Sequence, residues 1–379
     1  MEDLHSADCL KYNWVVWFFC GMNFPKTKRF AYFLYSFTYC FFITFGYSLT
    51  LTLGIFFIED IEALIGNLAI TSKSLTCTSK WISVFWQTNT LKRIERTMDE
   101  LDTFATTPVQ KTRLKETLNE AHVMFKFYSF VSTLVWLSCG STMVYQLTRG
   151  NVLYPGWYLI DWESSRMGLF VVFFYQLIGV GLEILANTTN DSYPAMLFIA
   201  LQGHYRILEA ALMDFKPGTP KNHRENYAAL IKCIVYHKKI ERVFASVVSH
   251  ISIPMFVQYL STGINLCLIA VSVVFFEVDA THKAYSAIYA WAVTLEMFGP
   301  CYFGEELIGE SDRLITHLFS CNWVDQDPKF KRALIIFMQN SQAPKIAKVG
   351  NLVDISLATF VSVMKFSYSL FALLNTMQN

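Results

Sequence analysis

Long apolar runs without charged residues alternate with polar, basic segments along this chain. Seven runs are long enough to cross a bilayer, since about 20 residues at ~1.5 Å each cover the hydrocarbon core. The second run is the weakest because it contains Lys73 and Lys80, and the sixth contains Glu296 and Glu305. The pattern predicts an all-α membrane protein with seven transmembrane helices, at residues 30–58, 61–86, 127–147, 167–185, 251–276, 284–308 and 351–379.

The composition agrees with this class. Hydrophobic residues make up 53% of the chain and charged residues only 16%, whereas soluble domains carry about 25% charged residues. The net charge of +1 gives no indication of a nucleic-acid partner. Acidic Glu2, Asp3 and Asp8, with no small-residue cleavage site after them, argue against a signal peptide.

Basic residues are distributed unevenly between the loops. The first 29 residues and the loops after the second, fourth and sixth runs hold 24 Lys and Arg, whereas the other loops hold three. Positive loops stay cytoplasmic, so the pattern predicts a cytoplasmic N-terminus and an extracellular C-terminus. This orientation is the reverse of a G-protein-coupled receptor. It places the glycosylation patterns at Asn187 and Asn190 inside the cell, where they stay unmodified.

These loops define the expected domains. Residues 1–29 form a cytoplasmic segment, 30–308 hold six spans with long cytoplasmic loops at 87–123 and 186–250, 309–350 form anchor helices, and 351–379 form the last span. The sequences of these loops predict helices, and we expect these helices to pack as one scaffold domain under the membrane. The predicted helices are Thr90–Asp102, Tyr193–Phe215, Glu225–Ser249 and one that begins at Asp327-Pro328.

Catalytic and metal-binding patterns are missing from the sequence. There is no His-Glu-x-x-His, no Gly-x-Ser-x-Gly and no P-loop, and the nine cysteines lack metal spacing. We therefore expect neither an enzyme nor a cofactor nor a bound metal. Gly179 and Gly181 in the fourth span indicate close helix packing.

Two features of the spans suggest a role. Glu296 and Lys365 both fall near mid-membrane, and we expect them to pair; the alternative is that each is solvated in a water-filled cavity. The outer halves of spans two to six are rich in aromatic and short polar side chains, which suits a small, weakly polar ligand, although ordinary core packing is the alternative. The candidate ligand residues are Thr71, Cys139, Thr142, Met143, Phe170, Phe173, Phe174, Tyr285 and Tyr289.

The last span carries a mixed stripe of small polar and apolar residues. Ser362, Phe366, Ser369, Leu373 and Thr376 fall on one side at helical spacing. Such a line is able to edge a water pathway, and the alternative is a helix packed through its hydroxyl groups against neighbours.

The sequence resembles the insect odorant receptor family over its whole length, and most specifically in the last ~80 residues. Tyr154–Tyr158 is similar to the family's second outer loop, with Leu159 in place of the usual second proline. The motifs that carry the resemblance near the C-terminus are Cys301–Leu307, Glu310-Ser311, Trp323, Lys331–Leu334, Phe337–Gln339, Gln342–Pro344, Gly350, Ser356-Leu357, Thr359-Phe360, Lys365 and Ser367–Ser369.

This resemblance implies a ligand-gated, non-selective cation channel. Four subunits enclose one pore with their last spans, and an odour-tuning subunit assembles with a shared co-receptor in the plasma membrane of olfactory sensory neurons. This chain is similar to a tuning subunit, because it lacks the co-receptor's long insertion between spans four and five. Transfer of the family pattern puts the gate at Leu373 and pore-lining positions at Ser369 and Thr376. The alternatives are a gustatory-type channel, a G-protein-coupled receptor and a transporter. The distribution of basic residues argues against a G-protein-coupled receptor, and the lack of internal repeats argues against a transporter.

Overall fold

The structure is a computed structural model that describes residues 4–22, 29–276, 279–350 and 352–378. It confirms the all-α membrane fold; residues 1, 351 and 379, which bound predicted domains, lie outside the described parts. The helices are α1 (Lys11–Phe19), α2 (Arg29–Tyr39), α3 (Gly46–Gly54), α4 (Ile61–Trp86), α5 (Thr88–Asp102), α6 (Pro108–Thr148), α7 (Arg166–Met213), α8 (His223–Phe275), α9 (Ala280–Ser320), α10 (Pro328–Asn340) and α11 (Leu357–Gln378). A 3-10 turn, η1 (Ser6–Leu10), precedes α1, a π-helical segment, η2 (Cys40–Phe45), joins α2 to α3, and a small hairpin of β1 (Lys348–Val349) and β2 (Val353–Asp354) precedes α11.

Four helices are much longer than the predicted spans and take in part of the expected helical loops. The predicted spans at 127–147, 167–185, 251–276 and 284–308 are parts of α6, α7, α8 and α9, which extend into the expected loops at 87–123, 186–250 and 309–350. The fall in hydropathy marks where a helix leaves the apolar layer and does not mark where it ends. The 53 residues of α8 span about 80 Å, against ~30 Å for a bilayer core, so more than half of a helix that crosses the core directly lies outside it.

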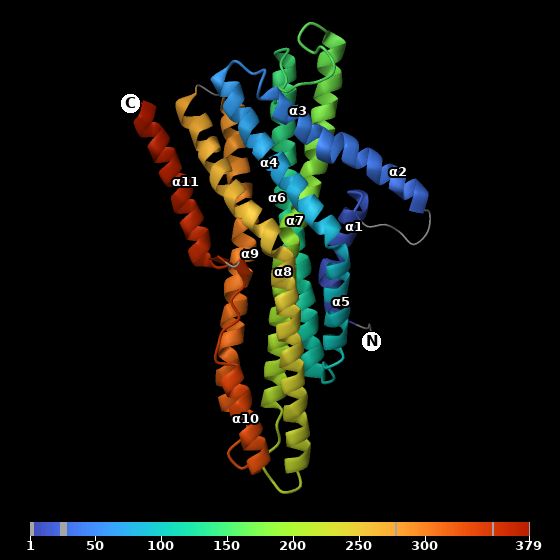
Figure 1. The fold of residues 1–379 in the computed structure, drawn as a ribbon, viewed down its shortest axis with the longest axis vertical. Helices are drawn as coiled ribbons and strands as arrows, with labels where there is room; N and C mark the ends of the chain where they lie inside the picture. Colours follow the sequence, from blue (N-terminus) through green and yellow to red (C-terminus); the bar gives the residue numbers. More distant parts are fainter. Residues whose placement is uncertain (1–3, 23–28, 277–278, 351, 379) are drawn as a thin grey trace.

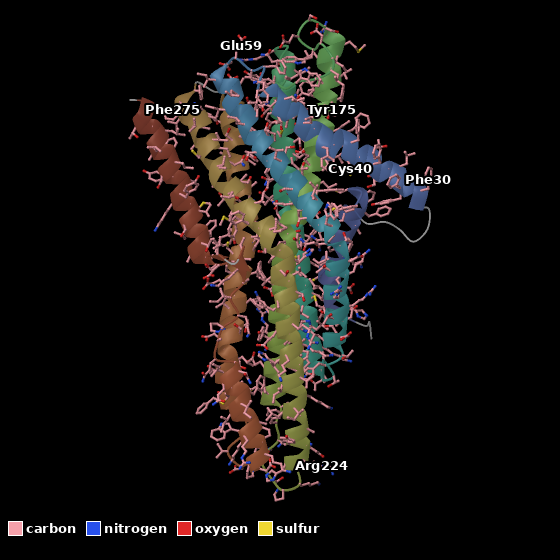
Figure 2. All side chains as sticks on the ribbon, in the orientation of Figure 1. Phe30, Cys40, Glu59, Tyr175, Arg224 and Phe275 are labelled. Atoms are coloured by element: carbon pink, nitrogen blue, oxygen red, sulfur yellow. The ribbon has the colours of Figure 1, made fainter. Side chains whose placement is uncertain are left out.

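The long helices form a bundle whose lower half is compact and whose upper half is splayed (Figure 1). Helix α8 runs from Arg224 near the lower tip to Phe275 near the upper end (Figure 2). Within the described residues, five helical stretches are long and apolar enough to cross a membrane: Phe30–Gly54, parts of α6, α7 and α8, and Leu357–Thr376. Helices α4 and α9, which carry the intramembrane charges, run beside them in the upper half.

Helix α7 is the axis of the lower half. Every residue from 186 to 205 is buried, including the polar run Asn187–Ser192. Helix α1 satisfies part of this run, because Trp17 Nε1 donates to Asn190 Oδ1 at 3.0 Å and Asn13 Nδ2 donates to the Thr189 carbonyl at 3.1 Å. Both glycosylation patterns are therefore enclosed by protein.

Two predicted local features are confirmed. A Cβ at Gly179 would lie 3.0 Å from the Tyr47 ring and one at Gly181 would lie 2.7 Å from Trp136 Nε1, so both glycines permit close helix packing. At the start of α10, Asp327 Oδ1 accepts from the Phe330 amide at 2.9 Å, which is the predicted cap.

The N-terminal segment is held to α5 by a carboxylate that is sensitive to pH. Asp102 Oδ2 accepts from the Ser6 amide and hydroxyl at 2.6 and 3.0 Å, and burial raises the pKa of Asp102 from 3.8 to about 7. An acid whose pKa is raised in the folded state favours folding when protonated, so this stabilisation is present at low pH and is lost as the pH rises from about 4 to about 7.

We therefore expect the N-terminal segment to be released more easily at pH 8 than at pH 6. Limited proteolysis of the purified protein over pH 5.5–8.5 measures this. Asp102→Asn should reduce the pH dependence, and the remainder should come from Glu95, which accepts from Trp14 and has a pKa that burial raises to about 7. Glu100→Gln is the control, because Glu100 is exposed on the same helix. Cleavage of the parent that does not vary with pH would contradict the assignment.

Candidate ligand-binding site

A narrow cavity of about 60 Å³ lies in the upper half of the bundle between α4, α6, α7 and α9. Small-molecule sites enclose about 300–1,000 Å³, so a ligand has to part the lining side chains to enter. Each helix contributes positions three or four residues apart, as expected for one inward face. They include Tyr128, Val131, Val135 and Cys139 on α6, and Val180, Glu183, Asn187 and Asp191 on α7.

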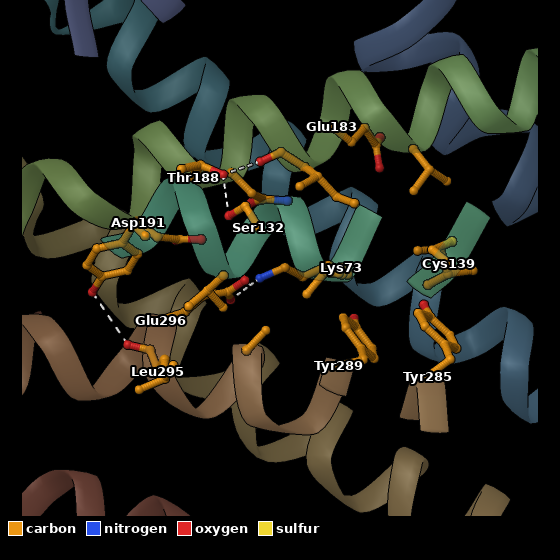
Figure 3. Close-up of a pocket in the computed structure, with 18 of the residues that line it drawn as sticks. Lys73, Ser132, Cys139, Glu183, Thr188, Asp191, Tyr285, Tyr289, Leu295 and Glu296 are labelled. Atoms are coloured by element: carbon orange, nitrogen blue, oxygen red, sulfur yellow. Dashed lines mark hydrogen bonds and ion pairs between the residues drawn. The ribbon is translucent and has the colours of Figure 1, made fainter. Parts of the chain in front are cut away.

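One end of the cavity is aromatic. The rings of Tyr285 and Tyr289 on α9 are stacked with centroids 5.8 Å apart, and Cys139 on α6 faces them (Figure 3). Ile70, Val135 and Ala292 complete an apolar wall. Such a surface binds the apolar body of a small organic molecule.

A closed roof covers this end. Tyr154 from the loop between α6 and α7 is buried, and its hydroxyl lies 2.6 Å from that of Tyr285. Gln176 Nε2 holds the Tyr154 carbonyl at 2.7 Å. The loop packs closely on α3, because a Cβ at Gly54 would lie 2.5 Å from the Gly156 backbone and one at Gly156 would lie 3.2 Å from the Thr50 carbonyl.

The other end of the cavity is ionic. Lys73 on α4 forms an ion pair with Glu296 on α9, and Gln258 Nε2 on α8 donates to Glu296 at 3.0 Å. The side-chain amide oxygen of Gln258, Oε1, accepts from Lys80, which forms a second ion pair with Asp191. These five side chains therefore form one connected row across four helices, which we call the charge ladder.

A further carboxylate faces the cavity beside the ladder. Glu183 Oε1 accepts from the Ser74 hydroxyl at 2.5 Å, and Ser74 in turn contacts Ser48 at 2.6 Å. Short hydroxyl side chains thus satisfy this carboxyl group, as burial at membrane depth requires.

The structure brings three of the nine candidate ligand residues to the cavity: Cys139, Tyr285 and Tyr289. Thr142, Met143 and Phe173 are buried in packing around it, and Thr71 donates to Asn67 Oδ1 at 2.7 Å. The prediction is corrected for Phe170 and Phe174, whose side chains are exposed on the outer side of α7. An aromatic residue in a span does not by itself show whether its side chain faces the cavity or the lipid.

Sequence reasoning missed the polar lining. Glu183, Asn187 and Asp191 belong to the cavity although the fourth span was expected to end at Leu185. The available signal was the spacing of these residues, which puts Glu183, Asn187 and Asp191 on one helical face in register with Val180.

The expected pair of Glu296 and Lys365 is corrected as well. Glu296 pairs with Lys73, whereas Lys365 is exposed on α11. The charge ladder requires α4 to cross both α8 and α9. The assumption that spans next to each other in the sequence are also neighbours in space does not reveal this crossing. On α11 the predicted stripe of Ser362, Phe366, Ser369, Leu373 and Thr376 is exposed along its length.

Helix α11 is attached to α9 and α8 mainly through residues of the C-terminal motifs that resemble the odorant receptor family. Glu305 Oε2 accepts from the Leu357 amide at 3.3 Å, at the positive N-terminal end of α11. A Cβ at Gly304 would lie 2.7 Å from the Ile355 carbonyl. Further along α11, Ser367 donates to the Gly263 carbonyl of α8 at 3.1 Å. Phe366 of the stripe also lies against Gly263, whereas Ser362, Ser369, Leu373 and Thr376 are exposed on the side away from this contact.

Removal of one charge from the ladder should destabilise the protein more than removal of two. Lys73→Met leaves Glu296 buried without its cation, at an expected loss of about 3–5 kcal/mol. The double variant Lys73→Met/Glu296→Gln should recover most of this loss, as measured by thermal unfolding of the purified protein in detergent. Lys365→Met is the control and should change stability little. A double variant no more stable than Lys73→Met would refute the pairing.

Comparisons with known proteins identify the family. The sequence profile of the 7tm Odorant receptor family matches residues 60–368. The chain is 30% identical to Odorant receptor 2a of Drosophila melanogaster, over 98% of this chain and 97% of that receptor, and 28% identical to Odorant receptor 33a of the same species with the same coverage.

The fold is also found in solved structures. The insect olfactory receptor OR5 from Machilis hrabei matches with a TM-score of 0.81 at 17% identity, over 96% of this chain and 97% of that one. Its complex with eugenol matches with a TM-score of 0.78 at 16% identity, over 98% and 97%. With a profile match over most of its length and relatives of nearly equal extent, this chain belongs to the insect odorant receptor family of multi-pass membrane proteins.

Proposed function

We propose that this chain is the odour-tuning subunit of a ligand-gated, non-selective cation channel. It assembles with the odorant receptor co-receptor, in a tetramer, in the plasma membrane of olfactory sensory neurons. The observation that supports this most directly is the exposed stripe on α11. A spanning helix with only 6% of its apolar stretch buried presents Ser362, Ser369 and Thr376 outward. Ser362 and Thr376 donate to carbonyls of their own helix, but a polar stripe of this kind suits water or a neighbouring subunit better than lipid.

The ligand of this proposal is a small volatile molecule in the cavity. Cys139, Tyr285 and Tyr289 provide its apolar surface, and the hydroxyl and carboxyl groups near Lys73 and Glu183 orient a polar substituent. OR5 from Machilis hrabei, which shares the fold, has been solved with eugenol, and eugenol combines these two features in one molecule.

Helix α8 connects the cavity to α11. Gln258 Nε2 donates both to Glu296 and to Thr262 Oγ1, the latter at 3.1 Å. The next residue, Gly263, accepts the hydrogen bond from Ser367 of α11. A ligand that shifts the Glu296 carboxylate therefore acts on the turn of α8 that holds the last helix. It opens the channel only as far as it binds the open state more tightly.

Co-expression with the co-receptor tests this function. Cells with and without the co-receptor receive eugenol, 1-octanol, ethyl hexanoate, benzaldehyde and 2-heptanone under a voltage clamp, with G-protein signalling blocked. We expect a current within milliseconds for at least one compound, and only with both subunits. Currents that disappear when G-protein signalling is blocked would favour a G-protein-coupled receptor instead.

Leu373 is the expected gate. An apolar ring closes a pore by excluding water, and a smaller side chain lets the constriction hydrate. Leu373→Ala should therefore raise the basal current several-fold without ligand, measured as the leak blocked by a pore blocker. Leu374→Ala is the control, because that residue is also exposed on α11 but lies outside the stripe. An unchanged closed state would remove Leu373 from the gate.

A further inference from the structure

A second hollow lies on the outside of the bundle between α6 and α7. Residues from 129–136 of α6 and 177–188 of α7 line it, and its volume is about 470 Å³. It shares Ser132, Ile184 and Thr188 with the ligand cavity. The two spaces are therefore neighbours with one common wall.

This hollow faces the lipid. Phe130 and Leu137 on α6 and Ile178 on α7 are apolar, and each is more than half exposed. Helix α11 packs on α8 and α9, so a pore built around α11 leaves the α6–α7 face on the outside. The hollow thus opens toward acyl chains.

The wall between hollow and cavity is thin. Thr188 Oγ1 donates to Ser132 Oγ at 2.6 Å (Figure 3), and both side chains are small. A single hydrogen bond of this kind contributes about 0.5–1.5 kcal/mol. Thr188 retains a second acceptor, the Ile184 carbonyl at 2.8 Å, so it loses no obligatory partner when the Ser132 contact opens.

The route from the aqueous side is blocked much more firmly. It passes the buried Tyr154, which is held through Tyr285 and Gln176, and the close contact of Gly54 with Gly156. Opening it would displace the loop and expose several buried polar groups at once. The lateral wall yields by movement of the Ser132, Ile184 and Thr188 side chains.

We infer that the α6–α7 hollow is a lateral portal, through which a small apolar ligand passes from the bilayer into the cavity by parting Ser132 from Thr188. The inference rests on the proposed function, because it takes the cavity as the ligand site. The bilayer concentrates apolar molecules at this face, since transfer of apolar surface from water is favourable.

Thr133→Trp tests the portal from the lipid side. Thr133 is exposed, lines the hollow and does not line the cavity, and its hydroxyl bonds only within its own helix. An indole there fills the outer mouth. A barrier on the path slows association and dissociation by the same factor and leaves the equilibrium unchanged. Leu137→Trp is the matched control, on the same lipid-facing side of α6 and outside the hollow.

The probe is whichever compound of the five-member panel gives the largest current in the parent channel. We expect Thr133→Trp to slow both current onset and washout at least about fivefold, with the half-maximal concentration unchanged, and Leu137→Trp to match the parent. Kinetics of Thr133→Trp equal to those of the parent overturn the portal, and so does a shifted half-maximal concentration without slowing. A parent channel that is silent to the whole panel overturns the proposed function itself.

A reversible closure gives a second test should Thr133→Trp fail to reach the surface. The pair Ser132→Cys/Thr188→Cys places two thiols where the hydroxyl oxygens are 2.6 Å apart. Oxidation should slow onset and washout together, and dithiothreitol should restore both. Ser132→Cys alone controls for the native cysteines. If the disulfide is confirmed to form and current onset and washout are the same before and after its reduction, the portal is contradicted.

Discussion

The structure depends on the need to satisfy charged groups within an apolar layer. Lys73, Lys80, Asp191 and Glu296 lie deep among apolar helices, where an unpaired charge would cost several kcal/mol. Gln258 joins the two ion pairs, since it accepts from Lys80 and donates to Glu296. The row fixes how α4 crosses α7, α8 and α9. That crossing creates the cavity, because it holds the splayed helices apart above the ladder while the lower half packs tightly.

The ladder also explains what the sequence did and did not reveal. Helix starts were predictable where local chemistry decides them, as at Asp327, and the spacing of glycines identified the close approach of α7 to its neighbours. The pairing of Glu296 was not predictable, because its partner is 223 residues away and depends on a crossing that no local pattern encodes. Hydropathy located the spans but failed to show that α6 to α9 continue unbroken past the apolar layer.

The candidate site illustrates the same division. Cys139, Tyr285 and Tyr289 could be selected because aromatic and short polar residues are typical of ligand sites. Phe170 and Phe174 share that character and face outward. A span in this protein is apolar on both its lipid side and its core side, so periodicity gives the spacing of the faces without telling which one is buried. Polar residues were the better indicator, since Glu183 and Asp191 have no acceptable place on the lipid side.

The arrangement also favours two discrete states over gradual deformation. Glu296 has two partners on different helices, Lys73 on α4 and Gln258 on α8. A ligand beside Lys73 competes for the Glu296 carboxylate. The carboxylate then either keeps only its hydrogen bond from Gln258 or moves together with α9, because any position between these two leaves a buried charge without a partner. Packed interiors respond to such a choice by switching. In the proposed channel, such a switch would reach the hydrogen bond from Ser367 to Gly263, because Gln258 and Gly263 lie about one turn and a half apart on α8.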